Sequence, residues 1–229
     1  DTVAYMVNIN IGADMAFTAP SVCWGNISSF TDASTNNSGS AILGYRWDFG
    51  DGNTATGTPA TNNYATAGTY TVKLIHDYGF NCYDSITKQV YVNAAPTAAF
   101  TIADACNTGT VTPVNGTTIT PAGTGINYSW LYGDNTAAQT GNAPPHIYAM
   151  SGNYTIQLIA TSDSLCADTV TQPVNVIRGT NIAFTAPPVC EGATTTFTDQ
   201  TTNPYNTTIV GYTWDFADGN TANTQNTTH

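Results

Sequence analysis

The sequence predicts an all-β fold of tandem β-sandwiches, and three observations carry that prediction. The chain of 229 residues repeats itself with a period of 83 to 84 residues, which indicates consecutive copies of one small domain. Within the copies, apolar residues alternate with polar ones at Val72 and Leu74 and again at Ile156 and Leu158, as in a half-buried strand. No window shows a sustained helical stripe. The repeated segment reads AFTAPSVC at Ala16–Cys23, AFTIADAC at Ala99–Cys106 and AFTAPPVC at Ala183–Cys190.

The strands are predicted to be short, because Asn, Gly, Asp and Pro interrupt the apolar segments about every 8 to 12 residues. Short strands at this spacing, in units of about 80 residues, predict a seven-strand sandwich of immunoglobulin type. Three tryptophans then occupy the core position on the third strand, and two tyrosines open the sixth strand and hold the loop before it. These residues are Trp47, Trp130 and Trp214, and Tyr70 and Tyr154.

The register of the repeat predicts the domain boundaries. Residues 1–15 are expected to form the last strand of a preceding repeat, and residues 16–95 and 96–179 two complete repeats. Residues 180–229 are expected to form the N-terminal part of a third repeat, so the chain is interpreted as a piece of a longer array. Units of about 80 residues have a marginal core, so covalent staples or contacts between neighbours are expected.

Composition narrows the range of functions. Charged residues make up 8% of the chain, four of them are basic, and the net charge is -11. Nucleic acid and anionic membranes both require clustered Lys and Arg, so neither is expected as a partner. No apolar run approaches the roughly 20 residues of a membrane-spanning helix. A surface rich in Thr, Asn, Ser and Gly favours an extracellular protein.

Several motifs recur in order and resemble those of the polycystic kidney disease (PKD) domain family. They are WDFGDG at Trp47–Gly52, GTYTV at Gly68–Val72, FTD at Phe30–Asp32 and at Phe197–Asp199, and Tyr64. The resemblance covers essentially the whole chain and implies immunoglobulin-like sandwiches of the PKD type. The second repeat departs from the pattern, because Leu131 replaces the first aspartate of the motif and Asn115 replaces Asp32. Asn closes the same side-chain turn as Asp, so the fold is expected to persist there.

The aspartates after each core tryptophan are expected to shape the following turn by side-chain hydrogen bonds. The first of them has no counterpart in the second repeat, which argues against a shared catalytic or calcium-binding role. The chain also lacks the DxDxDG loop of a calcium site, so no cofactor is expected, with calcium as the alternative. The aspartates of the motif are Asp48, Asp51, Asp134, Asp215 and Asp218.

The cysteines occupy two positions of the repeat and allow two pairing schemes. Cys23, Cys106 and Cys190 precede the second strand, and Cys82 and Cys166 follow the sixth. Pairing within a repeat joins Cys23 to Cys82 and Cys106 to Cys166, and closing a loop of about 60 residues stabilises each domain by roughly 3–4 kcal/mol. Strand parity instead places the two positions at opposite poles of one sandwich, roughly 20 Å apart and beyond disulfide reach.

Parity favours a link between consecutive repeats, in which Cys23 pairs with Cys166. Cys82, Cys106 and Cys190 would then pair with cysteines of neighbouring repeats outside residues 1–229. Both schemes remain open at the level of sequence. No CxxC pair with a neighbouring His supports a zinc site.

Two further groups of residues are the hydroxyl residues of a recurring triplet and the histidines. Asp-Ser/Thr-aliphatic triplets resemble the O-glycosylation acceptor of Bacteroidetes, and this resemblance implies glycans on Thr2, Ser85, Ser164 and Thr169. The alternative is that these triplets are the polar starts of strands. The histidines His76, His146 and His229 are expected at the surface or in turns, without a shared position in the repeat.

The resemblance extends to PKD repeats of very large Bacteroidetes surface proteins, which include gliding-motility adhesins exported by the type IX secretion system. It implies a non-catalytic stalk or filament of an adhesin at the bacterial cell surface. The expected partners are further repeats of the same chain, surface polysaccharide or other adhesin chains. The alternative is a set of modules that bind polysaccharide or protein, accessory to a secreted hydrolase.

Overall fold

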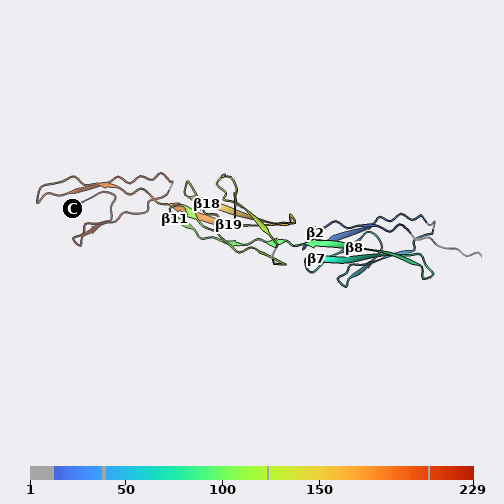
Figure 1. The fold of residues 1–229 in the computed structure, drawn as a ribbon. Coiled ribbons are helices and arrows are strands. Elements are labelled where there is room, and N and C mark those ends of the chain that lie inside the picture. Colours follow the sequence, from blue (N-terminus) through green and yellow to red (C-terminus); the bar gives the residue numbers. More distant parts are fainter. Residues whose placement is uncertain (1–12, 38–39, 123, 206) are drawn as a thin grey trace, which may run out of the picture. The chain divides into compact units, whose positions relative to one another are not determined.

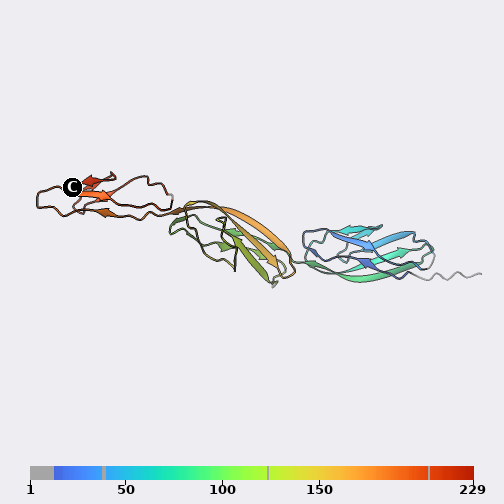
Figure 2. The same cartoon turned by 90° about the horizontal axis from the view of Figure 1, so that it is seen from above.

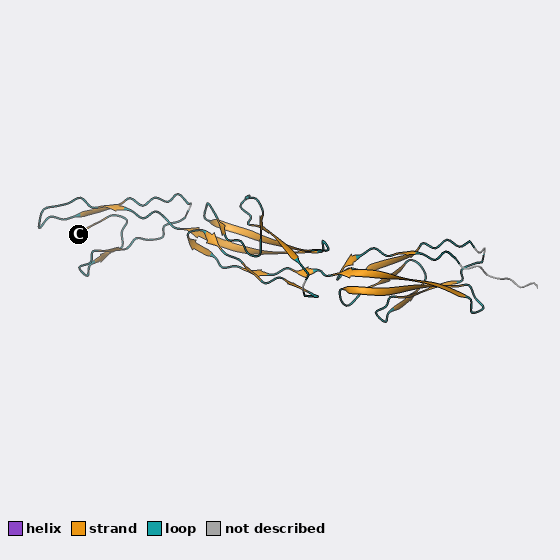
Figure 3. Cartoon of the chain, in the orientation of Figure 1, coloured by secondary structure: helices purple, strands orange, loops and turns teal. Residues whose placement is uncertain are grey.

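The computed structural model describes residues 13–37, 40–122, 124–205 and 207–229. The regular structure of these residues consists of strands joined by turns and loops, without helices (Figure 3). None of the described segments is a helix long and apolar enough to cross a membrane. The predicted all-β class is confirmed. The expected last strand of a preceding repeat, at residues 1–15, falls almost entirely outside the described residues.

Backbone contacts divide the chain into two compact units. The first unit comprises the chain up to Thr97 together with Thr118–Ile126 and Ala160–Asp168. The second comprises Ala98–Thr117, Asn127–Ile159 and Thr169–His229. The unit boundaries cut across the second repeat, because Thr118–Ile126 and Ala160–Asp168 are grouped with the first unit.

The first repeat is a sandwich of two sheets, seen as two layers in Figure 2. The first sheet has the order β1(Phe17–Thr18)-β3(Ser28–Asp32)-β6(Ala60–Asn62). The second has the order β2(Val22–Cys23)-β8(Tyr83–Asn93)-β7(Gly68–Asp77)-β4(Gly44–Asp48)-β5(Thr54–Thr56). All pairs are antiparallel except β2 with β8, which is parallel because the chain changes sheet between β1 and β2.

The core of the first repeat is aromatic and aliphatic. Trp47 is 1% exposed, its ring meets Phe17 edge to face at 5.3 Å between centroids, and its indole N–H donates to the Gly57 carbonyl at 2.8 Å. Val72 and Leu74 of β7 are fully buried against this cluster. Complete burial of each such side chain contributes about 1.5–3 kcal/mol. The alternation in the sequence therefore identified the inward face of β7.

The second repeat follows the same plan. Its main sheet has the order β11(Ala105–Asn107)-β19(Ala167–Arg178)-β18(Gly152–Ser162)-β15(Ile126–Leu131)-β16(Gln139–Thr140), labelled in part in Figure 1. The smaller pairs are β9(Pro96–Thr97) with β14(Thr118–Ile119), β10(Phe100–Thr101) with β13(Val114–Asn115), and β12(Thr110–Val111) with β17(His146–Ile147). β11 runs parallel to β19, as β2 does to β8. Trp130, Ile156 and Leu158 are fully buried in its core.

The described part of the third repeat contains two small sheets. One has the order β20(Phe184–Thr185)-β21(Thr196–Asp199)-β24(Thr227–Thr228), and the other pairs β22(Trp214–Asp215) with β23(Thr221–Ala222). Phe184 packs edge to face on Trp214, with 5.3 Å between ring centroids, as Phe17 does on Trp47. The aromatic arrangement of the first repeat is therefore reproduced in the third.

Candidate functional site

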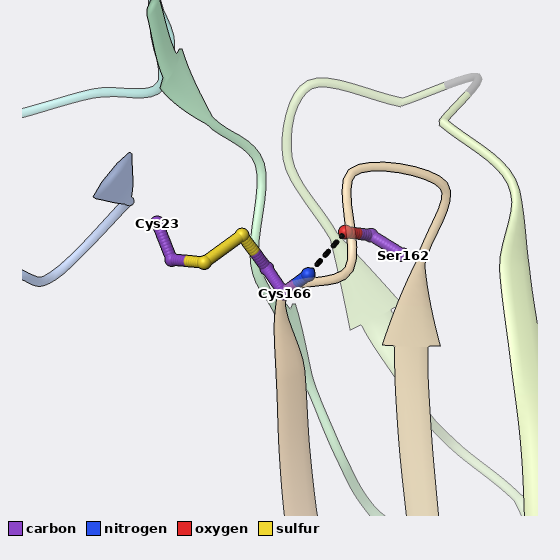
Figure 4. Close-up of a disulfide and its surroundings, with 3 residues drawn as sticks. All are labelled: Cys23, Ser162 and Cys166. Carbon is purple, nitrogen blue, oxygen red and sulfur yellow. Dashed lines mark hydrogen bonds between the residues drawn. A yellow bond between two sulfur atoms is a disulfide. The ribbon is translucent and has the colours of Figure 1, made fainter. Parts of the chain in front are cut away.

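The structure joins Cys23 to Cys166 in a disulfide, with 2.00 Å between the sulfurs and 5.6 Å between the Cα atoms (Figure 4). Cys23 ends β2 and lies opposite Asn93, the last residue of β8. Cys166 lies in the hairpin between β18 and β19. Both cysteines belong to the first compact unit, although one comes from the first repeat and the other from the second.

Local hydrogen bonds fix the segments on both sides of the disulfide between Cys23 and Cys166, which we call the cysteine joint. The Trp24 amide donates to the Asn93 carbonyl at 2.8 Å, and the Trp24 indole N–H donates to the Ala65 carbonyl at 3.2 Å. On the other side, the Cys166 amide donates to Ser162 Oγ at 3.2 Å, drawn as a dashed line in Figure 4. Cys166 is 1% exposed. The disulfide is therefore shielded from solvent on the Cys166 side and fixed to a sheet edge on the Cys23 side.

The other three cysteines are free thiols, with Cys82 half-buried and Cys106 and Cys190 exposed. The structure thus contains neither bond of the within-repeat scheme, which would join Cys23 to Cys82 and Cys106 to Cys166. Cys106 lies opposite Ile177 on the parallel pair of β11 and β19, the place that Cys23 takes on β2 and β8.

The turn aspartates bond within their own turns. Asp48 Oδ1 accepts from the Gly50 amide at 2.9 Å, and Asp51 Oδ1 accepts from the Asn53 amide at 3.0 Å. Asp51 Oδ2 also accepts from Asn62 Nδ2 at 2.7 Å, which ties the turn to β6. Burial alone raises the pKa of the Asp51 carboxyl, but the hydrogen bonds from Asn62 and Asn53 outweigh it and lower that pKa below its ordinary value of 3.8.

In the second repeat a histidine replaces the asparagine partner of the turn. Asp134 Oδ2 accepts from His146 Nε2 at 2.7 Å, and Gln139 Nε2 lies 3.0 Å from His146 Nδ1. The His146 ring stacks on Tyr132 with 4.1 Å between centroids. Burial raises the pKa of the Asp134 carboxyl, but the hydrogen bonds from Thr136 and His146 outweigh it and lower that pKa.

The third repeat has the same arrangement. Asp215 Oδ1 accepts from the Ala217 amide, and Asp218 Oδ2 lies 2.7 Å from His229 Nε2. The His229 ring stacks on Phe216 at 4.2 Å. Hydrogen bonds from the Asn220 amide, the Asn220 side chain and His229 lower the pKa of Asp218 to about 2.

The expectation that the histidines lie at the surface or in turns is wrong for two of the three. His76 is fully buried with its Nε2 atom 3.3 Å from Asp32 Oδ1, and His146 is 5% exposed. His146 and His229 do share a position in the repeat, because they are 83 residues apart and Asn62 lies 84 residues before His146. Sequence reasoning missed this position because it aligned the motifs by identity, and this position changes from Asn to His.

The predicted tyrosines hold the loop before the sixth strand. Tyr70 Oη donates to the Thr66 carbonyl at 2.8 Å, and Tyr154 Oη donates to the Met150 carbonyl at 3.0 Å. Tyr148 Oη donates to the Tyr132 carbonyl at 2.7 Å, as Tyr64 Oη does to the Phe49 carbonyl at 3.1 Å. Burial raises the pKa of Tyr64 to about 12. These hydroxyls therefore serve as donors to the backbone.

The candidate glycosylation residues are accessible where the structure describes them. Ser85 on β8, Ser164 in the β18–β19 hairpin and Thr169 on β19 are exposed, and Thr2 lies outside the described residues. Among the described residues, no group of three His, Cys, Asp or Glu side chains is placed to hold a metal ion. Among the described residues, the disulfide between Cys23 and Cys166 is the candidate site whose geometry is most fully defined.

Comparison with known proteins identifies the repeat. The family model described as "PKD domain" matches residues 12–92, 93–177 and 180–229. The PKD1 domain of Vibrio anguillarum Epp is 25% identical, with 37% of this chain and 96% of that chain covered and a TM-score of 0.34. The PKD1 domain of the Vibrio cholerae metalloprotease PrtV is 28% identical, with 36% of this chain and 98% of that chain covered and a TM-score of 0.32.

A third solved structure, of fibronectin(III)-like modules of Clostridium thermocellum CbhA, is 16% identical and covers 71% of this chain and 94% of that chain at a TM-score of 0.35. The family matches span nearly all of the sequence in three consecutive copies, and each copy carries the tryptophan, the turn aspartate and the aromatic core described above. The chain therefore belongs to the PKD domain family, as a tandem array of immunoglobulin-like β-sandwiches.

Proposed function

We propose that this chain is a non-catalytic, structural segment of a large extracellular protein, in which disulfides join consecutive PKD repeats. The disulfide between Cys23 and Cys166 carries the proposal. Such a bond restricts the angle between two repeats, whereas a bond within one repeat leaves the linker free. A string of repeats joined in this way resists bending and extends a distant binding part away from the cell.

The periodicity of the cysteines supports extension of this scheme along an array. Cys106 and Cys190 stand at the repeat position of Cys23, and Cys82 stands at the position of Cys166. Each of these three thiols would pair with a cysteine of a neighbouring repeat outside residues 1–229. The partners of this segment are accordingly further repeats of its own chain.

Contacts inside the second compact unit support close packing of repeats without a disulfide. The Arg178 guanidinium lies over the Tyr205 ring at 4.1 Å from its centroid, and Arg178 Nη1 donates to the Tyr148 carbonyl at 2.8 Å. Thr207 Oγ1 donates to the Arg178 carbonyl and lies 2.8 Å from Ser151 Oγ. Arg178 and Tyr205 are both half-buried, and a cation–π contact at such a site contributes about 1 kcal/mol. These polar contacts therefore hold the second and third repeats against each other.

We propose that the segment lies at a bacterial cell surface, and its composition and motif resemblance support this location. A chain with four Lys and Arg residues offers few sites to trypsin-like proteases, and its Thr- and Asn-rich surface is hydrated without charge. The cysteine-bearing type of PKD repeat resembles repeats of Bacteroidetes adhesins that serve gliding motility and leave the cell by type IX secretion. We place this segment in the stalk of such an adhesin, with glycans on the exposed Ser85, Ser164 and Thr169.

A non-reducing tryptic map tests the proposal. Cleavage after Arg46, Lys73, Lys88 and Arg178 separates Cys23, Cys82 and Cys190 onto different peptides and leaves Cys106 and Cys166 together. The expected result is a disulfide between the peptide of residues 1–46 and that of residues 89–178. A bond between residues 1–46 and 74–88 would contradict the proposal, because each repeat would then be stapled to itself.

Binding of polysaccharide is a second candidate, favoured by one feature of the second unit. A depression of about 400 Å³ is lined mainly by amide and hydroxyl side chains, with no charged group: Ser151, Gly152, Asn153, Asn175, Val176, Ile177, Thr207 and Thr208. Neutral hydrogen-bonding groups of this kind suit a ligand rich in hydroxyls. Retention of the chain on immobilised surface polysaccharide, lost on Asn153→Ala with Asn175→Ala, would support this function and with it an accessory role beside a secreted hydrolase.

A further inference from the structure

The cysteine joint closes most of the first two repeats into one covalent loop. Cys23 and Cys166 are 143 residues apart in the sequence, whereas their Cα atoms lie 5.6 Å apart. A pull on the two ends of the chain therefore passes from Cys23 through the two sulfurs to Cys166, without passing through the backbone between them. Residues 24–165 form a loop that such a pull does not straighten.

The two segments on either side of the joint are the ones that a pull must stretch. Residues 13–23 include β1 and β2, and residues 166–178 include β19 with its 12 residues up to Arg178. We call these two segments the tension path. Neither contains a turn or a bend. A strand rises about 3.3 Å per residue, close to the limit of about 3.3–3.6 Å for a fully extended chain, so stretching β19 adds little length.

The backbone that could lengthen lies inside the loop instead. Among the described residues of the first two repeats, every residue with positive φ lies between the two cysteines, from Gly25 to Leu165. Such residues mark tight turns, where the chain reverses its direction. Opening a turn lengthens the chain, whereas pulling along a strand does not. The disulfide thus takes the turns out of the tension path and leaves a strand in it.

The sheets hold the tension path in place. β2 pairs in parallel with β8, where Cys23 lies opposite Asn93. β19 lies between β11 and β18 in its sheet, and the Cys166 amide donates to Ser162 Oγ at the start of this strand (Figure 4). The neighbouring strands β8, β11 and β18 all belong to the closed loop. Their hydrogen bonds position the path, but the covalent bonds of the path transmit the pull.

We propose that the disulfide between Cys23 and Cys166 is a mechanical bypass, through which tension runs along the chain without unfolding the first two repeats. This inference rests on the proposed function, because tension arises where the segment connects a distant binding part to the cell. The cores of the two repeats are attached beside the path and do not transmit the pull. Resistance to stretching therefore comes from covalent bonds, whereas the packing of each repeat resists bending.

Stretching single molecules of the 229-residue chain in optical tweezers tests the proposal, with handles joined to both ends by peptide tags so that no cysteine is used. The oxidised chain should reach a full length roughly 500 Å shorter than that of Cys23→Ser, since 143 residues stay hidden at about 3.3–3.6 Å each. Cys82→Ser is the matched control and should hide the same length. The full length is measured on the stretched chain, so the result does not depend on how well Cys23→Ser folds. Equal full lengths of the oxidised chain and Cys23→Ser would overturn the proposal.

The hidden length also identifies the bond that hides it. A bond between Cys23 and Cys82, which are 59 residues apart, would hide roughly 200 Å, and this hidden length would vanish in Cys82→Ser. That result would overturn the bypass together with the proposed function, because each repeat would then be closed on itself.

A core variant tests the bypass while the disulfide is in place. Leu158 is fully buried in the second repeat, so Leu158→Ala leaves a cavity that weakens the packing of this repeat. The substitution should lower the unfolding force in the Cys23→Ser chain and leave the force–extension curve of the oxidised chain unchanged. A lower force or an added length in the oxidised chain would mean that the core transmits the pull. The bypass would then be wrong, although the disulfide and the proposed function would stand.

Discussion

The first and second repeats have the same framework and differ at two places, the partner of the turn aspartate and the state of the hairpin cysteine. The carboxylate of the turn accepts from an amide in the first repeat, Asn62 to Asp51, and from an imidazole in the second, His146 to Asp134, both at 2.7 Å. The hairpin cysteine is a free thiol in the first repeat and part of a disulfide in the second. The turn therefore requires a donor at a set distance and tolerates a change of residue type, whereas the cysteine depends on a partner in another repeat.

Loss of the disulfide should have the largest effect on stability. Cys23→Ser should lower the free energy of unfolding by about 4 kcal/mol, since the bond closes a very long loop. The measurement is denaturant unfolding without reductant, followed by tryptophan fluorescence. Cys82→Ser is the matched control, because Cys82, the equivalent residue of the first repeat, forms no disulfide among the described residues. Equal effects of the two substitutions would show that the disulfide between Cys23 and Cys166 contributes nothing to the free energy of unfolding.

The glycine of the turn should be equally important in both complete repeats. Gly50→Ala and Gly133→Ala should each destabilise by roughly 2–3 kcal/mol, since the new methyl group meets a strand backbone and the residue has positive φ. Gly52 also has positive φ, at 92°, but a Cβ placed on it has nothing within 4 Å. Gly52→Ala should therefore lower the free energy of unfolding by about 1 kcal/mol. Thermal unfolding of the three variants separates the steric contribution from the backbone one, and a Gly52 variant as unstable as the others would refute the close approach.

The turn carboxylates should make both repeats sensitive to acid. The pKa values of Asp51 and Asp134 are lowered on folding, so their contribution is complete above the unfolded value of 3.8 and is lost as pH falls through the folded values. Asp134→Ala should cost about 1.5–2 kcal/mol at pH 7, the contribution of a hydrogen-bonded charge. Its unfolding free energy should fall less between pH 5 and pH 2 than that of the unaltered chain. An identical pH dependence would rule out the carboxylate as a source of acid sensitivity.

Exchange of the donors should have the smallest effect. His146→Asn in the second repeat and Asn62→His in the first should each change the free energy of unfolding at pH 7 by less than about 1 kcal/mol, because both residues donate one N–H to the aspartate. His146→Ala is the contrasting variant and should cost more, since it removes the donor to Asp134 Oδ2, the partner of Gln139 and the ring stacked on Tyr132. Equal losses of stability in His146→Asn and His146→Ala would contradict the prediction that asparagine replaces histidine as the donor.

Much of the fold could be predicted from the sequence because local patterns specify it. The alternation around Val72 and Ile156 identified the inward faces of β7 and β18, and the spacing of the tryptophans identified the core of each repeat. The PKD family and the all-β class followed from motifs that recur in order. The shared repeat position of His146 and His229 was not predicted, although the interval of 83 residues between them equals the repeat period.

Local patterns in the sequence predicted the all-β class, the core residues and the turn aspartates, since each depends on residues close together in the chain. The recurrence of whole motifs revealed the repeat period of 83 to 84 residues. Strand parity favoured the pairing of Cys23 with Cys166, and the tertiary structure decided between this pairing and the one within a repeat, because the choice depends on which strand ends meet after the sheets have folded. It also decided that His76 is buried beside Asp32. Burial and pairing of this kind arise from contacts between segments distant in sequence, for which a local pattern carries no signal.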